Sequence, residues 1–343
     1  MDLKQRFQQA FPAAFFLEKD IKAVNNYLQQ QNWLQAGEMV IALEKPGEGN
    51  MNFVLRATTN QRSFILKQAR PWVEKFPQID APVERVAVEA QFFQTLQNVD
   101  SINPYIPKCL GFDANNFMLA TEDLGKGADY SFLYQKDNLL TDADIDGLTQ
   151  YLSALHRVTI PTDFPTNLAM RQLNHEHIFN FPYLAENGFN LDDVQAGLQA
   201  AAMPYKRNVA LKAKIKACGA IYLAQGKHLL HGDFYPGSWL KVKDGLKVID
   251  PEFGFVGPAE FDLGVLFAHL LMAEQSSAVF KTVAEKYQQP IGFQEGLFSQ
   301  FVGIEILRRL IGIAQLPLSL DLTAKKRLME QAAKWIMEEK ITL

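Results

Sequence analysis

One β-like segment inside an otherwise helical half constrains this chain more than any other feature. Residues 228–255, HLLHGDFYPGSWLKVKDGLKVIDPEFGF, place short apolar runs on both sides of a DG dipeptide, which is a preferred turn of β-hairpins. Outside that turn, the segment carries three acidic residues, Asp233, Asp250 and Glu252. The surrounding helices must therefore enclose a hairpin that presents carboxylates, which indicates a mixed fold with a polar site.

The N-terminal part of the chain is β-rich after a helical start. Residues 1–36 have apolar side chains at helical intervals, and the runs MVIALEK, NFVLRATT and RSFILKQ then follow. They are separated by PGEGN and TTNQ, which are turn sequences, so we expect an antiparallel three-stranded meander. A helix is predicted over residues 82–98, and two further strands over 108–112 and 117–121.

The C-terminal part is mainly helical beyond a linker, EDLGKG, at residues 122–127. Apolar periodicity predicts helices at 142–156, 191–202, 209–225 and 261–273, with three more toward the C-terminus. We therefore expect two lobes, residues 1–122 and 123–343. A small β lobe, a short linker and a helical lobe with one embedded hairpin together resemble the protein-kinase-like fold, an α+β class.

The first lobe contains candidates for binding the phosphates of ATP. The turn with Gly47, Gly49 and Asn50 lies between the first two predicted strands, where backbone N–H groups approach phosphate in such folds. Lys67 ends the third strand, and Glu89 follows on the apolar stripe of the predicted helix. Each alone is ordinary for a surface residue, but their order and spacing favour an ion pair that holds the nucleotide phosphates.

The second lobe contains candidates for the chemical step. Asp233, in HGD, is predicted to accept the proton of the acceptor hydroxyl. Asp250 and Glu252 lie two residues apart, and in an extended segment such residues project to the same side. Both carboxylates would then face one Mg²⁺ ion, which prefers oxygen ligands. The alternative is a turn with two solvated acids.

Ser238 stands where a kinase-like catalytic loop has a metal-binding asparagine, five residues after Asp233. We interpret this as a rebuilt metal site in which Glu252 supplies the missing ligand. Asp262 is predicted to cap the next helix. His175 and His177 have the spacing of a metal pair, but without an evident third ligand they are interpreted as ordinary histidines. His231 is expected to orient the catalytic loop.

Longer motifs resemble the methylthioribose kinases, which belong to the aminoglycoside/choline phosphotransferase branch of the kinase-like fold. The resemblance is carried by HGDFYPGS, by VIDPEFGFVGPAEFDLG, by PGEGNMNFVLRA, by SFILKQARPWV and by IEILRRLIGIAQL, and it spans about residues 40 to 320. It implies that ATP and Mg²⁺ are used to convert 5-methylthioribose to its 1-phosphate. It also implies that Arg308 and Arg309 lie near the sugar or the transferred phosphate, and it suggests a homodimer.

Several questions stay open at this point. Glu122 and Leu124, in the linker, are expected to contact adenine through their backbone groups. The segment 174–183 is a contracted version of a longer family segment, so the acceptor could instead be an aminoglycoside, choline or another sugar. A catalytically silent nucleotide-binding regulator is disfavoured, because the base and both metal carboxylates are present.

Charge and hydropathy argue against nucleic acid and membrane as partners, so we expect a small-molecule substrate. The net charge of −4 gives no basic surface for nucleic acid. The longest apolar run, residues 263–273, is too short to span a bilayer and contains His269. The N-terminus lacks the apolar core of a signal peptide, so we expect a cytoplasmic protein. Cys109 and Cys218 are expected to stay reduced.

Overall fold

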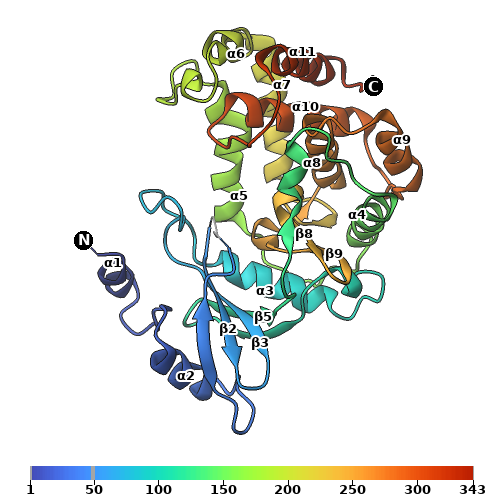
Figure 1. Cartoon of the computed structure of the whole chain (residues 1–343). Helices are drawn as coiled ribbons and strands as arrows, with labels where there is room; N and C mark the ends of the chain where they lie inside the picture. The colour runs from blue at the N-terminus through green and yellow to red at the C-terminus, as the bar shows by residue number, and fades with distance from the viewer. Residues whose placement is uncertain (1, 48–50, 343) are drawn as a thin grey trace.

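The β-rich N-terminal runs form a five-stranded antiparallel sheet with the order β1-β2-β3-β5-β4. The structure is a computed structural model that describes residues 2–47 and 51–342. The strands are β1 (Val40–Glu44), β2 (Phe53–Thr59), β3 (Ser63–Gln68), β4 (Cys109–Asp113) and β5 (Met118–Glu122). Figure 1 shows this sheet and the first helices in the lower part of the molecule, with the helical lobe above them. The predicted α+β architecture with two lobes is confirmed.

Two helices precede the sheet, and the second of them packs against it. They are α1 (Leu3–Ala10) and α2 (Ile21–Gln30). The side chain of Asp20 caps α2 by accepting a hydrogen bond from the backbone N–H of Ala23. The buried face of α2 packs with Leu55 and Leu66 of the sheet in a separate hydrophobic core.

The helix α3 (Arg85–Leu96) lies between the sheet and the helical lobe (Figure 1). It starts three residues later than the predicted Pro82, and Glu84 occupies its N-cap position. Phe92 and Phe93 are buried in the large core of the helical lobe. This helix therefore belongs to the first lobe in sequence but is anchored in the core of the second.

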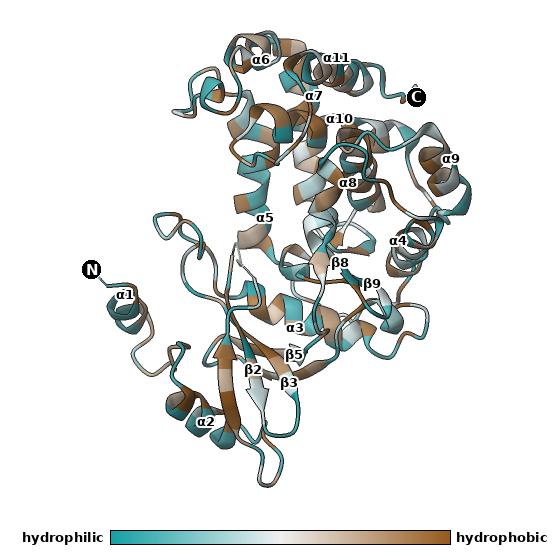
Figure 2. Cartoon of the chain, in the orientation of Figure 1, coloured by the Kyte–Doolittle hydropathy of each residue, from teal (hydrophilic) through white to brown (hydrophobic). Residues whose placement is uncertain are grey.

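The helical lobe is built from eight α-helices of the described chain. They are α4 (Asp142–Leu155), α5 (Leu168–His175), α6 (Leu198–Arg207), α7 (Val209–Leu223), α8 (Ala259–Met272), α9 (Ser277–Lys286), α10 (Glu295–Ile311) and α11 (Leu322–Glu338). Nearly every residue of α8 and α10 is buried, so these two helices form the centre of the lobe. The outer helix α11 alternates hydrophobic and hydrophilic residues, which can be followed in Figure 2.

The embedded β segment forms two short antiparallel pairs within the helical lobe. The strand β7 (His228–Leu230) pairs with β10 (Phe255–Gly257), and β8 (Trp239–Val242) pairs with β9 (Gly245–Val248). A two-residue strand, β6 (Ala128–Asp129), adds to β8. The chain between β7 and β8 carries Asp233, and the chain between β9 and β10 carries Asp250 and Glu252, so the pairing brings the two acidic loops together.

Two segments differ from the sequence-based expectation or extend it. The predicted helix at 191–202 is wrong as one element: Leu191–Asp193 form a 3₁₀ turn, and α6 starts only at Leu198. Gly197 separates them with φ 83°, a conformation that an α-helix cannot contain. The segment after α5 continues as a π turn, Glu176–Asn180, and a 3₁₀ turn, Phe181–Tyr183.

Within the part of the chain that the structure describes, no helix combines the length and the apolar character needed to cross a membrane.

Candidate active site

Lys67 lies at the meeting point of three elements. Its ammonium group donates to Glu89 Oε1 on α3 at 2.7 Å and also contacts the carboxylate of Asp250. Burial opposes the charge on Lys67, but the nearby carboxylates outweigh it and raise the pKa of the Lys67 ammonium. Burial raises the pKa of Glu89 to about 7. The predicted pair of Lys67 and Glu89 is therefore present in the geometry, and it is shared with the acidic loop of the other lobe.

The glycine-rich turn falls partly outside the described residues. Gly47 is described and exposed, whereas Gly49 and Asn50, the other two predicted phosphate contacts, lie outside the described residues. The chain is described again from Met51, two residues before β2. The phosphate-binding role of this turn therefore stays a prediction.

The linker between the lobes is attached to the sheet through Asp123. Its carboxylate accepts hydrogen bonds from Arg56 Nε at 2.8 Å and from Ser63 Oγ at 2.6 Å. Glu122 is the last residue of β5 and pairs with Phe64 of β3. Glu122 and Leu124 flank this anchor, and their predicted contact with adenine stays a prediction.

Asp262 of α8 anchors the loop that carries Asp233. The buried carboxylate of Asp262 accepts the backbone N–H groups of His231 at 2.6 Å and Gly232 at 3.0 Å. The predicted capping role of Asp262 is wrong, because α8 starts at Ala259 and places Asp262 inside its first turn, facing the loop. The sequence signal was a carboxylate inside an otherwise apolar helix, FDLGVLFAHLL.

Gly232 and His231 determine the backbone conformation of the loop next to Asp233. Gly232 has φ 80°, and a Cβ atom there would lie 2.1 Å from the carbonyl oxygen of Phe253. The Nε2 atom of His231 lies 3.0 Å from the carbonyl oxygen of Ile249, so this nitrogen carries the proton. The other ring nitrogen of His231 accepts the backbone N–H of Asp233 at 3.4 Å. His231 thus connects the two acidic loops, in agreement with the expected orienting role.

Ser238 closes the loop that carries Asp233 on itself. Its hydroxyl donates to the backbone carbonyl oxygen of Asp233 at 2.9 Å, and its backbone N–H donates to Tyr235 at 2.8 Å. The side chain is buried. Ser238 therefore fixes the backbone of Asp233, and this hydrogen bond accounts for a small hydroxyl side chain at this position.

The acidic loop is not extended, so that part of the prediction is wrong. Asp250 has φ 61° and ψ 49°, and Pro251–Phe253 form a 3₁₀ turn. The Asp250 side chain is 46% exposed, whereas Glu252 is buried. Asn167 holds the loop by donating to the carbonyl oxygens of Glu252 and Gly254 at 2.9 and 3.0 Å.

Glu252 faces the first lobe. Its Oε2 atom accepts a hydrogen bond from Asn52 Nδ2 at 2.8 Å and lies 3.3 Å from Arg85 Nε. Burial raises the pKa of Glu252, while Arg85 and Lys67 act in the opposite direction. Asn52 and Arg85 were not identified from the sequence, because their partner lies far away along the chain.

Asp233 faces two guanidinium groups of α10. Its Oδ1 atom lies 3.5 Å from Arg309 Nη2 and 3.6 Å from Arg308 Nη2. The Asp233 side chain is 23% exposed, so it remains accessible to a substrate. Burial raises the pKa of Asp233 above its usual range, and the two arginines limit that rise. The geometry thus brings together the three residues that the sequence predicted near the acceptor.

A buried network orients the two arginines. Glu305 accepts Arg308 Nε at 2.5 Å, Arg309 Nε at 2.8 Å and His269 Nε2 at 2.9 Å. His269 Nδ1 in turn lies 2.6 Å from the hydroxyl of Tyr134. Because a carboxylate only accepts, Nε2 of His269 carries the proton, and Nδ1 accepts from Tyr134. Both arginines therefore use their Nε atoms for Glu305 and direct their terminal nitrogens toward Asp233.

The charge balance around Lys67 and Arg85 suits a divalent cation. Lys67 and Arg85 oppose three carboxylates, those of Glu89, Asp250 and Glu252, all linked through the contacts above. Over residues 2–47 and 51–342, no group of three or more His, Cys, Asp or Glu side chains forms a complete metal cage. One or two carboxylates plus substrate phosphates is the usual protein environment of Mg²⁺, and Asp250 and Glu252 fit it.

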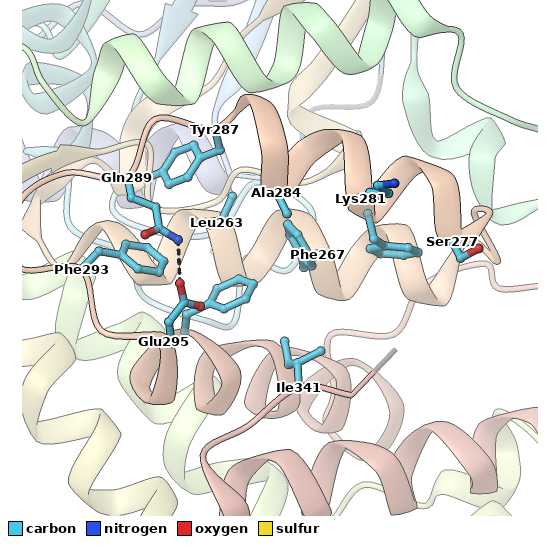
Figure 3. Close-up of a pocket in the computed structure, with 12 residues that line it drawn as sticks. Leu263, Phe267, Ser277, Lys281, Ala284, Tyr287, Gln289, Phe293, Glu295 and Ile341 are labelled. Carbon is cyan, nitrogen blue, oxygen red and sulfur yellow. Dashed lines mark hydrogen bonds between the residues drawn. The ribbon is translucent and has the colours of Figure 1, made fainter.

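A separate cavity lies elsewhere in the helical lobe. It has a volume of about 350 Å³ and is bordered by α8, α9, α10 and Ile341, near the C-terminus (Figure 3). Its walls are mainly apolar, with Phe267 and Phe280 among the lining residues. None of the candidate site residues lines it, so the cavity is distinct from the candidate active site.

Comparison with known sequences gives a family. Residues 45–297 match the model of a family described as the phosphotransferase enzyme family. The methylthioribose kinase of Exiguobacterium sibiricum is 26% identical over 330 residues, covering 81% of this chain and 81% of the relative. The methylthioribose kinase of Bacillus cereus strain AH187 is 27% identical over 360 residues, covering 90% of this chain and 88% of the relative.

Comparison with solved structures gives the same fold. Choline kinase LicA from Streptococcus pneumoniae superposes with a TM-score of 0.51 at 15% identity, covering 92% of this chain and 98% of the other. Spectinomycin phosphotransferase APH(9)-Ia, solved with ADP and spectinomycin, superposes with a TM-score of 0.52 at 11% identity, covering 94% and 99%. At these identities the likeness concerns the fold alone.

Proposed function

The chain belongs to the phosphotransferase enzyme family, whose members transfer a phosphoryl group to a hydroxyl acceptor, and we propose that it uses ATP to phosphorylate an uncharged sugar. The proposed acceptor is 5-methylthioribose, and the proposed product is 5-methylthioribose 1-phosphate. Relatives with this name cover most of the chain, and the HGD, DPE and RR motifs resemble that family.

One observation carries the choice of an uncharged acceptor. Asp233 faces the guanidinium groups of Arg308 and Arg309 at 3.6 and 3.5 Å. A cationic acceptor, such as choline or an aminoglycoside, would have to bring its positive charge beside these two cations. Like charges at close range repel, most strongly where the surroundings are partly desolvated. A neutral polyol instead offers hydroxyl groups that accept from the arginines and donate to Asp233.

The residues support a division of roles in phosphoryl transfer. The acceptor oxygen would form a bond to the γ-phosphorus while the bond to the β,γ-bridging oxygen breaks, leaving ADP. Asp233 would orient the attacking hydroxyl and receive its proton. Arg308 and Arg309 would stabilise the charge on the transferred group, and Lys67, held by Glu89, would bind the α and β phosphates.

Asp250 and Glu252 are the proposed holders of Mg²⁺. Asp250 presents an exposed carboxylate, and Glu252 uses Oε2 for Asn52 and Arg85, so Oε1 is the atom left for a cation. When bound, Mg²⁺ neutralises negative charge on the nucleotide phosphates. Gly47, Gly49 and Asn50 are proposed to cover the phosphates, and Glu122 and Leu124 to contact adenine.

Mass spectrometry of the reaction products tests this function. The protein is incubated with ATP, Mg²⁺ and 5-methylthioribose, and a parallel sample contains EDTA in excess of the metal. We expect the mass of one added phosphoryl group on the sugar, together with ADP, in the first sample only. Unchanged sugar in the complete reaction would exclude 5-methylthioribose as the acceptor.

A further inference from the structure

A buried triangle of Asn52, Arg85 and Glu252 connects the two lobes next to the candidate metal site. Asn52 directly precedes β2, Arg85 starts α3, and Glu252 lies in the acidic loop of the helical lobe. Asn52 donates to Glu252 Oε2 at 2.8 Å and accepts from Arg85 Nε at 2.9 Å. All three residues are at most 5% exposed.

The hydrogen-bond inventory of Arg85 shows why Asn52 matters in this triangle. A guanidinium has five N–H donors. Here Nε donates to Asn52, and the terminal nitrogens donate to four backbone carbonyl oxygens, those of Met51, Arg70, Trp72 and Pro82. Arg85 therefore offers Glu252 a positive charge but has no N–H group left to orient its carboxylate. The orienting hydrogen bond comes from Asn52.

Glu252 is in turn fixed by the charge of Arg85. Among the described residues, Glu252 is the one carboxylate within 4.0 Å of the Arg85 guanidinium. Leaving a buried arginine without its carboxylate partner strongly destabilises the folded protein. Glu252 therefore stays beside Arg85, and the direction of its other oxygen, Oε1, depends on how Asn52 holds Oε2.

We propose that Asn52 is a positioning residue that orients Glu252 toward the metal ion and thereby joins the phosphate-covering side of the first lobe to the metal loop. The same side chain connects the start of β2 with the loop that follows Asp250. Binding of the Mg²⁺–nucleotide complex then depends on Asn52 through its hydrogen bond to Glu252. This inference rests on the proposed function only in requiring a Mg²⁺–nucleotide complex, and it is independent of the acceptor.

Calorimetric titration with a non-hydrolysable ATP analogue tests the inference without any acceptor. The variants are Asn52→Ala and Asn52→Leu, the second of which preserves most of the buried volume. Asn25→Ala is the matched control, because Asn25 also makes side-chain hydrogen bonds in the first lobe, to Val40, but lies away from Glu252. Each protein is titrated with Mg²⁺ present and again with EDTA, after circular dichroism has established which variants are folded.

We expect both Asn52 variants to raise the Kd of the Mg²⁺ complex about tenfold, since a hydrogen bond to a charged group is lost. The Kd measured in EDTA, and both Kd values of Asn25→Ala, should stay within about twofold of the wild-type values. An Asn52 variant that is folded and binds the Mg²⁺ complex like wild type would overturn the inference. Equal weakening with and without Mg²⁺ would also overturn it, because that pattern indicates general loosening of the lobe.

The outcomes separate this inference from the proposed function. If wild type binds the Mg²⁺ complex and only the Asn52 variants lose affinity, the inference stands even if 5-methylthioribose is not phosphorylated. If wild type shows no Mg²⁺-dependent nucleotide binding, both proposals fail. If Asn52→Ala is unfolded, Asn52→Leu decides the question, and if neither variant folds, the role of Asn52 is structural and the inference is overturned.

Discussion

At the scale of single residues, the site depends on how Asp233 is surrounded. Its backbone is fixed by Ser238 and His231, and its carboxylate faces two arginines while staying 23% exposed. The Asp233 carboxylate therefore stays accessible, whereas the neighbouring side chains of Glu305 and His269 are bound within their own hydrogen-bond network. An accessible carboxylate with a defined direction is what orienting an acceptor hydroxyl requires.

The first prediction concerns this carboxylate. Asp233→Asn keeps the size of the side chain but removes the proton acceptor, so we expect kcat to fall about 10²- to 10⁴-fold. Nucleotide binding should be unchanged, because Asp233 lies on the acceptor side. Steady-state kinetics and nucleotide titration measure the two effects. Asp244→Asn, in the exposed turn of the same hairpin, is the control. An Asp233→Asn protein with wild-type kcat would contradict the assigned role.

At the scale of secondary-structure elements, α8 and α10 place the chemistry. The helix α8 supplies Asp262 to the catalytic loop and His269 to the arginine network, while α10 supplies Glu305 and both arginines. Both helices are buried almost throughout, so the polar side chains on them are held by dense packing. A rigid pair of helices therefore fixes the geometry of the loop above it.

The second prediction concerns the support of the loop by α8. Asp262→Asn replaces one accepting oxygen with an NH₂ group, which cannot pair with both backbone N–H groups. We expect kcat to fall about tenfold to a hundredfold, with little change in the KM for ATP. Glu260→Gln is the control, because Glu260 is a buried acid of the same helix that accepts the backbone N–H of Gln294 instead. A larger kcat loss in the control would contradict this role of Asp262.

The third prediction concerns pH and the contact between α8 and α10. Burial lowers the pKa of His269 from 6.5 to about 4, so the folded state binds its proton less readily than the unfolded state. The stability contribution is present above pH 6.5 and is lost as the pH falls toward 4, amounting to about 3 kcal/mol. Thermal unfolding of His269→Gln across this range should show a shallower loss than wild type. Equal slopes for wild type and His269→Gln would contradict the assignment.

The same elements show what a sequence can and cannot predict. The order of Lys67, Glu89, Asp233 and Asp250 follows from local patterns, because each residue stands at a recognisable point of a strand, helix or hairpin. Asp262 was misjudged because capping depends on where the helix starts, and Ala259 starts it earlier.

The role of Glu252 depended on a partner from another part of the chain. Asn52 lies 200 residues away in sequence, and their contact is created by the packing of the lobes. Local periodicity contains no information about that packing. The same reason explains why Arg85 was not identified as the charge beside Glu252.

At the scale of the whole molecule, the two lobes share a hydrophobic core as well as a contact surface. The large core of the helical lobe includes residues of α3, which belongs to the first lobe by sequence. The second core, between α2 and the sheet, is separate. Lys67 and Asn52 add polar contacts from the sheet side to the acidic loop. Nucleotide binding between the lobes should therefore stabilise the molecule as a unit.

The fourth prediction follows from this coupling. A Mg²⁺–nucleotide complex at about a hundred times its Kd should raise the Tm by roughly 4 °C, because a ligand that binds only the folded state adds about 2.7 kcal/mol. Differential scanning calorimetry of wild type and Asp233→Asn should show the same shift. A shift confined to one of two separate transitions would contradict the coupling of the lobes.

The measurement that tests the central claim most directly is ADP release with four acceptors offered separately under identical conditions. These are 5-methylthioribose, ribose, choline and kanamycin, each with ATP and Mg²⁺. Because Asp233 faces Arg308 and Arg309, we predict rapid turnover with 5-methylthioribose and none above background with the two cationic acceptors. Turnover with choline or kanamycin but not with either sugar would contradict the account.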